Sequence, residues 1–465
     1  MKSSSTTDIV DALVSKGVLT EEEGKLISKG HESKKKSEGN IGFKNGFKIN
    51  SGDGKSNFSV NGRIQADYRY FDIGNGEAAG TNTTGEMNAD TYDIRRAYLG
   101  AKGTFRDWIN FEATIDAAGS AAYVKYYWLE TAFSDKFKIR FGQFKPGFGL
   151  EQNTSSRFID MTERDWAASI APGVNKGIMV HGVPTPGITY AFTMFNGPAN
   201  TTASYIADAS QKSAELSNNQ DGKSYAARLT ANIAELVGNK DAIMHLGADY
   251  VYDDNATGAT AGALYFRTNA RGTGFFSTKA AGAGANGAMY FSPDITRYGL
   301  EGIGSYGPVK LQAEYANMEF SENAKNNKSL DAYYVNLSWM ITGESYASAY
   351  KNGLMDRMSP KNDFTGLGSG GMGAWELGVR YSVFNAEDFI LGTDTTTDAS
   401  TNKAHSYTAG VKWIVDPNTR FLLDYVYTDF ENNIFGNQKE NANAVVGGAK
   451  FNKENAVNFR AQFDF

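Results

Sequence analysis

The feature that most constrains the fold is a two-residue alternation that recurs along most of the chain. From about residue 57, apolar residues such as Ile64 and Tyr68 alternate with polar residues such as Arg63 and Asp67. A period of two is the signature of a β-strand whose two faces meet different surroundings. The same pattern returns many times, for example over residues 421–427. The sequence therefore predicts an all-β chain.

The polar face of these segments distinguishes a membrane β-barrel from a soluble β-sandwich. Its charges recur strand after strand, and charged side chains cannot fill the packed core of a soluble sandwich. Aromatic residues make up 13% of the chain, and their rows on the other face match the girdles of a lipid-facing wall. No apolar run reaches the roughly 18 residues that a membrane helix needs. We therefore expect a transmembrane β-barrel in the bacterial outer membrane.

About sixteen segments carry the alternation, an even number, as bacterial barrels require. Their connections mostly alternate between short and long, as periplasmic turns alternate with outer loops. Two connections break this rule, because 118–121 is short where a loop is expected and 342–372 is long where a turn is expected. The predicted strands of the antiparallel barrel are 57–71, 91–103, 107–117, 122–133, 136–145, 175–182, 187–195, 222–234, 241–253, 293–305, 308–319, 330–341, 373–385, 404–416, 419–429 and 456–465.

Residues 1–56 differ from the barrel segment 57–465 and form a predicted periplasmic unit. Apolar residues recur there at helical spacing, and Thr20 with Glu23 forms a capping box that opens a second short helix. Residues 30–56 are rich in Lys, Ser and Gly and are predicted to be a linker. The apolar face of so small a unit needs a partner. We favour self-association with sister chains over docking on the barrel.

A resemblance to the phosphate-selective porin O/P family rests on motifs spread along nearly the whole chain. Residues 138–166 read KIRFGQFKPGFGLEQNTSSRFIDMTERDW. This is similar to the family's stretch G-Q-F-K-x-P/G-F-G-x-E, followed by T-S-S and E-R. Further similarities are DIRRAYLGAKG at 93–103, MFNG at 194–197, WMITGES at 339–345, GAWELGVRYS at 373–382 and the N-terminal VDALVSKGVLTEEEGKLI.

The resemblance implies a sixteen-stranded homotrimer in which an outer loop at about 147–174 folds inward as a constriction. It implies passive diffusion of phosphate or other small anions along lumen arginines and lysines. It also implies contact with outer-membrane lipid and lipopolysaccharide. Phe465 closes an alternating strand at the end of the chain, and this resembles the signal read by the barrel assembly machinery.

The basic residues of the inward face form the candidate anion path. Fixed cations in a narrow pore offset the hydration that an anion loses, and the guanidinium fork of Arg matches phosphate and carboxylate geometry. The alternative is that most wall cations pair with inward carboxylates such as Asp67, Glu112 and Glu376 and serve structure. The candidates are Arg63, Arg96, Lys136, Lys138, Arg140, Arg228, Arg380 and Lys412 on the wall, with Arg157 and Arg164 on the loop.

Other functional classes have little support in the sequence. The chain has no Cys and four His without metal-ligand spacing, and it carries no nucleophile or nucleotide motif in a suitable context. We expect no enzyme, no cofactor, no metal and no nucleic-acid partner. The net charge of −6 does not indicate an anion channel, so the local distribution of charge must decide ion selectivity. Two alternatives stay open: a general low-selectivity porin, and a barrel that anchors a partner, such as a sleeve for a redox protein.

Overall fold

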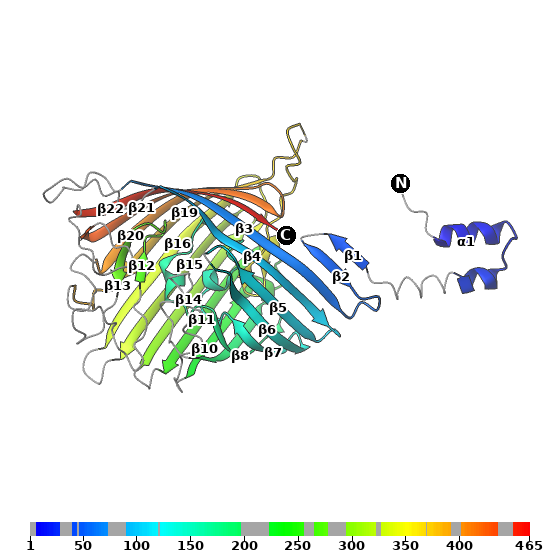
Figure 1. Ribbon diagram of the computed structural model, residues 1–465, viewed down its shortest axis with the longest axis horizontal. Helices are drawn as coiled ribbons and strands as arrows, with labels where there is room; N and C mark the ends of the chain where they lie inside the picture. The colour runs from blue at the N-terminus through cyan, green and yellow to red at the C-terminus, as the bar shows by residue number, and fades with distance from the viewer. Residues whose placement is uncertain are drawn as a thin grey trace.

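Most of the protein forms one closed barrel of tilted strands (Figure 1). The computed structural model describes residues 6–27, 40–43, 46–72, 90–119, 121–196, 223–254, 265–277, 294–321, 327–368, 370–391, 401–435 and 450–465. Within these ranges, no helix is long and apolar enough to cross a membrane.

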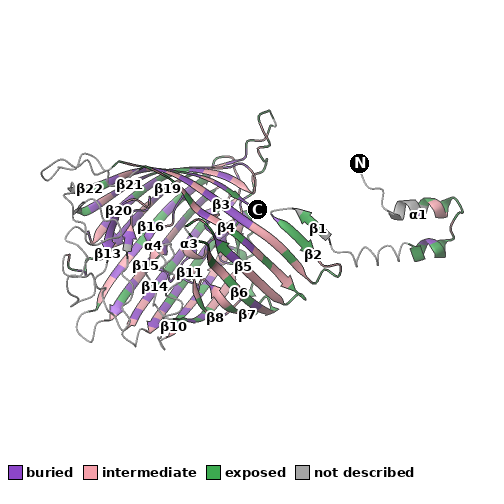
Figure 2. Ribbon diagram, viewed as in Figure 1, coloured by how far each residue is buried: buried purple, intermediate pink, exposed green. Residues whose placement is uncertain are grey.

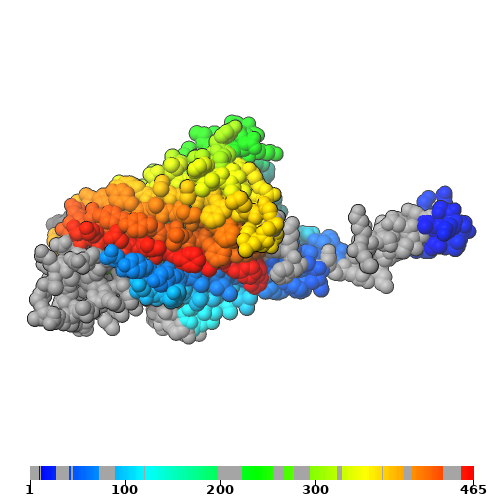
Figure 3. Space-filling model, turned by 90° about the horizontal axis from the view of Figure 1, so that it is seen from above, coloured from blue at the N-terminus to red at the C-terminus, as the bar shows by residue number. Residues whose placement is uncertain are grey.

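Sixteen strands of the described chain form the barrel, and each pairs antiparallel with the next. The last strand closes on the first, with Asp464 opposite Arg63, and Figure 3 shows the red C-terminal strand lying against the blue one. The predicted sixteen-stranded antiparallel barrel is confirmed. Its strands are β3 (Asn57–Asp72), β4 (Thr91–Phe105), β5 (Ile109–Asp116), β6 (Tyr123–Ser134), β7 (Phe137–Phe144), β8 (Asn175–Thr185), β9 (Ile188–Asn196), β10 (Lys223–Asn232), β11 (Ala242–Asp254), β14 (Asp294–Tyr306), β15 (Val309–Ser321), β16 (Lys328–Met340), β19 (Ala374–Asn385), β20 (Lys403–Ile414), β21 (Thr419–Phe435) and β22 (Lys450–Asp464).

Side-chain burial follows the predicted parity of the strands. In β15, Val309 and Leu311 are exposed on the outer face, whereas Lys310 and Gln312 are buried inside the barrel. Figure 2 shows this alternation along neighbouring strands. Apolar rows outside and polar rows inside are the reverse of a soluble protein, and they suit a wall between lipid and an aqueous lumen.

Most predicted strand boundaries lie within a few residues of the observed ones, and the exceptions have local causes. The predicted strand 222–234 stops at Asn232, because the short helix α6 (Ile233–Leu236) begins there. Strands β21 and β22 extend well beyond the predicted 419–429 and 456–465. Their added residues are mostly polar, so the apolar alternation that marks a membrane crossing is absent from them.

The N-terminal unit combines helices with an unpredicted hairpin. Helix α1 spans Thr6–Ser15, residues 21–27 are also helical, and Thr20 and Glu23 form the predicted capping box with N–H to oxygen distances of 2.9 and 3.3 Å. The linker prediction for 30–56 is wrong in part, because β1 (Asn40–Phe43) and β2 (Phe47–Asn50) form a hairpin within it. Strand β2 pairs with the first residues of β3, and its alternating Phe47 and Ile49 stand among Lys and Asn.

Two outer segments fold into the barrel and pack against its inward face. The connection 145–174 between β7 and β8, here called the inner loop, carries α3 (Leu150–Asn153) and α4 (Trp166–Ile170). The hairpin of β12 (Tyr265–Arg267) and β13 (Gly274–Ser277) lies beside it. The Trp166 ring lies 5.4 Å from that of Phe275 and 6.2 Å from that of Phe384 on β19. This apolar cluster packs against residues of β9–β11, β14–β16 and β19–β21 on the inward face of the barrel.

A third inserted segment explains why the connection 342–372 is long where a turn was expected. It carries the 3₁₀ helix η2 (Tyr346–Ala349) and the strands β17 (Tyr350–Lys351) and β18 (Leu354–Met355). Tyr346 is buried together with wall residues such as Ile303 and Ile414. Its backbone N–H donates to the carbonyl of Gly307 in the turn between β14 and β15. The segment therefore enters at the end of the barrel that carries the short turns, the periplasmic end.

Candidate permeation site

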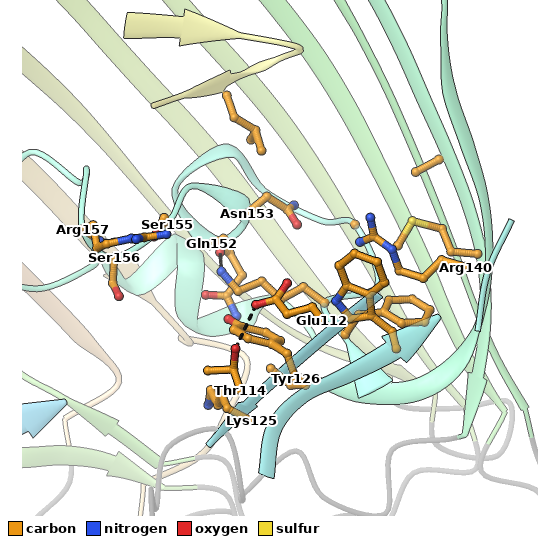
Figure 4. A pocket seen from close by; sticks show the side chains of 18 of the residues that line it. Glu112, Thr114, Lys125, Tyr126, Arg140, Gln152, Asn153, Ser155, Ser156 and Arg157 are labelled. Atoms are coloured by element: carbon orange, nitrogen blue, oxygen red, sulfur yellow. Dashed lines mark hydrogen bonds between the residues drawn. The ribbon is translucent and has the colours of Figure 1, made fainter. Parts of the chain in front are cut away.

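A cavity of about 560 Å³ lies between the inner loop and the wall formed by β3 to β10. Figure 4 shows Gln152 and Asn153 of the inner loop on one side and Thr114, Lys125 and Tyr126 of the wall on the other. Eleven Lys or Arg side chains line the cavity, against three Asp or Glu side chains, so positive charge dominates locally. The basic lining residues are Arg63, Arg95, Arg96, Lys125, Lys138, Arg140, Lys145, Arg157, Arg164, Arg228 and Arg271.

Two β-bulges add cations to this wall. The register between β3 and β4 shifts so that Arg95 is the extra residue, and both Arg95 and Arg96 line the cavity. A second shift between β5 and β6 does the same for Lys125 and Tyr126. A bulge inserts one residue into a strand and re-aims its side chains. Two consecutive residues can therefore face the lumen, which strict alternation forbids.

Six of the eleven basic residues make no ion pair with a carboxylate anywhere in the described ranges. Arg63 donates to the Ser156 hydroxyl at 2.6 Å, and Arg96 donates to the Gln65 side-chain oxygen at 2.8 Å. Such neutral partners fix the position of a guanidinium group without cancelling its charge. The six residues are Arg63, Arg96, Lys125, Lys145, Arg164 and Arg271.

The other predicted cations of the cavity have acidic partners. Arg140 lies 2.6 Å from Glu130, Lys138 lies 3.1 Å from Asp135, and Arg228 lies 2.6 Å from Glu301. Arg157 on the inner loop lies 3.5 Å from Asp464. Pairing reduces the field that these groups present to a passing ion. For these four residues the structure agrees with the alternative that cations of the predicted path pair with carboxylates.

Three predicted site residues do not line this cavity. Lys136 is exposed in the turn between β6 and β7. Arg380 pairs with Glu151 at 3.2 Å, and Lys412 pairs with Glu376 at 2.9 Å. Both pairs lie on the side of the lumen that the inserted segments fill. The alternation along the strands predicted the inward direction of Arg380 and Lys412. It could not predict which part of the lumen the inserted segments occupy.

Wall carboxylates hold the inner loop against the barrel. The Glu314 carboxylate accepts the backbone N–H groups of Leu150 and Glu151 at 2.7 and 2.8 Å. The Asp424 carboxylate accepts the backbone N–H of Thr162 at 2.6 Å. These bonds satisfy backbone N–H groups that would otherwise be buried without a partner, which is costly. The inner loop is thus anchored to the wall at residues 150–151 and at Thr162.

Burial and neighbouring charges of the wall and of the inner loop shift the pKa values of two inner-loop residues, Glu163 and Lys145. Burial raises the pKa of Glu163, but the guanidinium groups of Arg95 and Arg460 outweigh burial and hold the pKa well below its usual range. The distances are 2.7 Å to Arg95 and 2.8 Å to Arg460. Burial and then the positive charge of Arg164 hold the pKa of Lys145 well below its usual range.

Sequence reasoning missed Arg95, Lys125, Lys145 and Arg271 as members of the cavity. Parity assigned only one residue of the Arg95–Arg96 pair to the lumen, and the doublet itself was the available signal of a bulge. Lys145 lies in the motif that carried the family resemblance. Arg271 lies in the turn between β12 and β13, and nothing local in the sequence indicates that this turn enters the barrel. In the described part of the chain, no three His, Asp or Glu side chains converge to hold a metal ion.

Comparison with known proteins identifies the family. The family model described as phosphate-selective porin O and P matches residues 58–465, which is the barrel apart from Asn57. The chain belongs to this family. Porin O of Pseudomonas aeruginosa is 29% identical over 408 residues, covering 83% of this chain and 86% of that protein.

Solved outer-membrane barrels are among the structures to which the chain is similar. OprB of Pseudomonas putida matches with a TM-score of 0.50 and 11% identity, covering 88% of this chain and 94% of that chain. The trimer form of OmpT of Vibrio cholerae matches with a TM-score of 0.46 and 13% identity, covering 88% and 99%. The protein is an outer-membrane porin, and its relatives in the phosphate-selective porin O and P family are channels.

Proposed function

We propose that this porin passes small anions, such as phosphate or other small anionic solutes, by passive diffusion along the cavity beside the inner loop. The observation that carries the proposal is the set of six cavity cations without a carboxylate partner in the described chain. An anion that enters a narrow pore loses hydration, and fixed positive charges offset this loss. The same charges raise the energy of a cation. Arg63, Arg96 and Arg164 are held by neutral partners, so their charge is available to a solute.

The net charge of the chain is −6, yet this does not oppose the proposal. Exposed charges separated by more than a Debye length of about 8 Å are largely screened in physiological salt. Charges that line the cavity lie close to a passing ion and are screened much less. The excess of basic residues around the cavity therefore weighs more on selectivity than acidic residues elsewhere.

A general low-selectivity porin is the second candidate, and one observation favours it. Arg140, Arg228 and Lys138 are ion-paired, so only part of the basic wall presents a free charge. The sleeve for a partner protein is less well supported, because the protein's own inserted segments occupy much of the lumen in the described ranges.

The test is a planar bilayer measurement with phosphate on one side and chloride on the other. A reversal potential that favours phosphate supports phosphate specificity, equal permeation supports general anion passage, and cation current overturns the proposal. Arg157→Ala and Arg164→Ala test the inner loop. Both are expected to lower anion preference, with the larger loss in Arg164→Ala because Arg157 shares its charge with Asp464. Unchanged preference in both variants removes the loop from the mechanism.

We propose a homotrimer, with the face of β5 to β9 as the contact surface. Strands β5 and β7 have eight residues each and β9 has nine, with twelve in β6 and eleven in β8 between them, against thirteen in β14, β15 and β16. Eight residues tilted at about 45° rise roughly 19 Å, which is less than the apolar band of about 25 Å in such barrels. A neighbouring protomer would cover this low wall. Native mass measurement in detergent tests the trimer, and a monomer contradicts it.

The remaining expected partners follow from the surface and the end of the chain. The exposed apolar rows suit lipid and lipopolysaccharide on the outer wall. The Phe465 ring packs over Gly62, and their backbones exchange hydrogen bonds of 3.0 and 3.1 Å. We propose that the barrel assembly machinery reads Phe465 before this contact forms. We also propose that residues 1–56 lie in the periplasm and self-associate.

A further inference from the structure

The cavity wall carries aromatic rings as well as cations. Tyr98, Tyr123, Tyr126, Trp128 and Phe144 all line the cavity, on β4, β6 and β7. The lumen wall of a porin is ordinarily polar, and inorganic anions gain little from an aromatic face because its quadrupole is negative. A row of rings beside free cations therefore points to a solute that has an apolar part and a negative charge.

Most of these rings are already covered by the protein's own cations. The Arg63 guanidinium lies 4.1 Å from the ring centre of Tyr98, and that of Arg140 lies 4.0 Å from the ring centre of Trp128. The Lys125 ammonium lies 5.6 Å from the ring centre of Tyr123. These cation–π contacts leave the covered faces unavailable to a solute.

Tyr126 differs from its neighbours. In the described ranges its ring makes no aromatic or cation–π contact and its hydroxyl makes no hydrogen bond. The residue paired with it across the sheet is Thr114, and the next in line is Gly100, so only small side chains flank the ring on the side of β5. A Cβ at Gly100 would lie 2.5 Å from the Thr114 hydroxyl oxygen, so a larger residue than glycine does not fit there unless Thr114 shifts.

Charged groups of both signs surround the Tyr126 ring. The bulge places Lys125 on the same face as Tyr126, and Figure 4 shows both beside Glu112 and Thr114. The Glu112 carboxylate accepts a hydrogen bond from Thr114 at 3.0 Å. Arg63 and the inner-loop residue Arg164 line the same cavity without an acidic partner in the described chain.

We propose that this cavity binds aromatic carboxylates, with the ring of the solute on Tyr126 and its carboxylate on Lys125. The inference rests on the proposed anion passage and names a solute class for the same cavity. Stacking of two rings adds to simple burial of apolar surface. A planar aromatic carboxylate should therefore bind up to about tenfold more tightly than a saturated one of equal size.

The experiment measures how benzoate and cyclohexanecarboxylate reduce the chloride current through the full-length porin in a planar bilayer. The saturated ring controls for size and charge. The wild-type protein should be half-blocked at a benzoate concentration several-fold to about tenfold lower than that of cyclohexanecarboxylate. Tyr126→Leu should abolish this difference, and Tyr126→Phe should retain it because the ring remains. Lys125→Gln should weaken block by both compounds.

The neighbouring Tyr127 supplies a matched control. It is 65% exposed on the outer face of the same strand, so Tyr127→Leu should leave the benzoate preference unchanged. Equal block by the two compounds in the wild-type protein overturns the inference, as does a benzoate preference that survives in Tyr126→Leu. Failure of the proposed anion passage is recognised separately, because the chloride current before any blocker is added would then lack anion preference.

Discussion

Replacing Arg96 with Gln should reduce the anion preference of the pore about tenfold. Arg96 is buried, lines the cavity and has the Gln65 side chain as its partner instead of a carboxylate. A monovalent ion roughly 6 Å from its guanidinium gains or loses about 0.7 kcal/mol in bulk water and about 2.8 kcal/mol at an effective dielectric constant of 20. The smaller value applies to a water-filled cavity. In Arg96→Gln an anion loses this stabilisation and a cation is freed of the same repulsion. The free-energy difference between anion and cation therefore changes by about 1.4 kcal/mol, and the permeability ratio by about tenfold.

The assay is the reversal potential of single channels in a potassium chloride gradient. Lys136→Gln is the matched control, because it removes the same charge from an exposed turn that does not line the cavity. Its ratio should stay close to that of the wild-type protein. An unchanged ratio in Arg96→Gln, or an equal loss in both variants, would refute the argument that partner-free cavity cations set the selectivity.

Three further predictions concern the loop, the pH dependence and the outer hairpin. Glu314→Gln leaves one acceptor oxygen in place of two for the backbone N–H groups of Leu150 and Glu151, so docking of the inner loop should weaken by about 1–2 kcal/mol. The change should appear as greater current noise and faster proteolysis within 145–174, and wild-type behaviour would contradict this anchor. Lys145 is charged only below its lowered pKa, so anion preference should fall as pH rises through that value, at a lower pH than for an ordinary lysine. Lys145→Arg should flatten this pH profile, and a flat profile in the wild-type protein would exclude a role of Lys145 in selectivity. A Cβ at Gly272 would lie 2.5 Å from the Glu454 carboxylate, whereas one at Gly304 meets no atom within 4 Å. Gly272→Ala should therefore destabilise the barrel by about 1–3 kcal/mol and Gly304→Ala much less, measured as the midpoint of heat-induced unfolding in detergent.

The barrel could be predicted from the sequence because its determinants are local. Each strand has one face toward lipid and one toward the lumen, so apolar and polar residues alternate along it, as do Val309 and Lys310. The inward direction of Arg63, Arg228 and Arg380 followed from the same parity. The number of strands followed from counting such segments.

The composition of the cavity could be predicted only in part, because two of its causes are not local. Bulges depend on how neighbouring strands pair, so parity placed Arg96 in the lumen and missed Arg95, and it missed Lys125 for the same reason. The second cause is the inward course of three connections. The unusual length of 342–372 was visible in the sequence, but its burial against wall residues such as Ile303 depends on the assembled barrel. These insertions decide which lumen cations, such as Lys412, lie away from the open cavity.

The hairpin of β1 and β2 shows a further limit. Its strands have only four residues each, too few for periodicity to distinguish them from a linker. Strand β2 is specified by pairing with β3, where Phe47 lies opposite Val60. The local composition, rich in Lys and Asn, gave no signal of that pairing.

The most direct test of the account is the reversal potential of the wild-type porin under a tenfold potassium chloride gradient in a planar bilayer. We expect a potential of the sign set by chloride, since cations without a carboxylate partner in the described ranges outnumber acidic residues in the cavity beside the inner loop. A potential near zero, or one of the sign set by potassium, would contradict it.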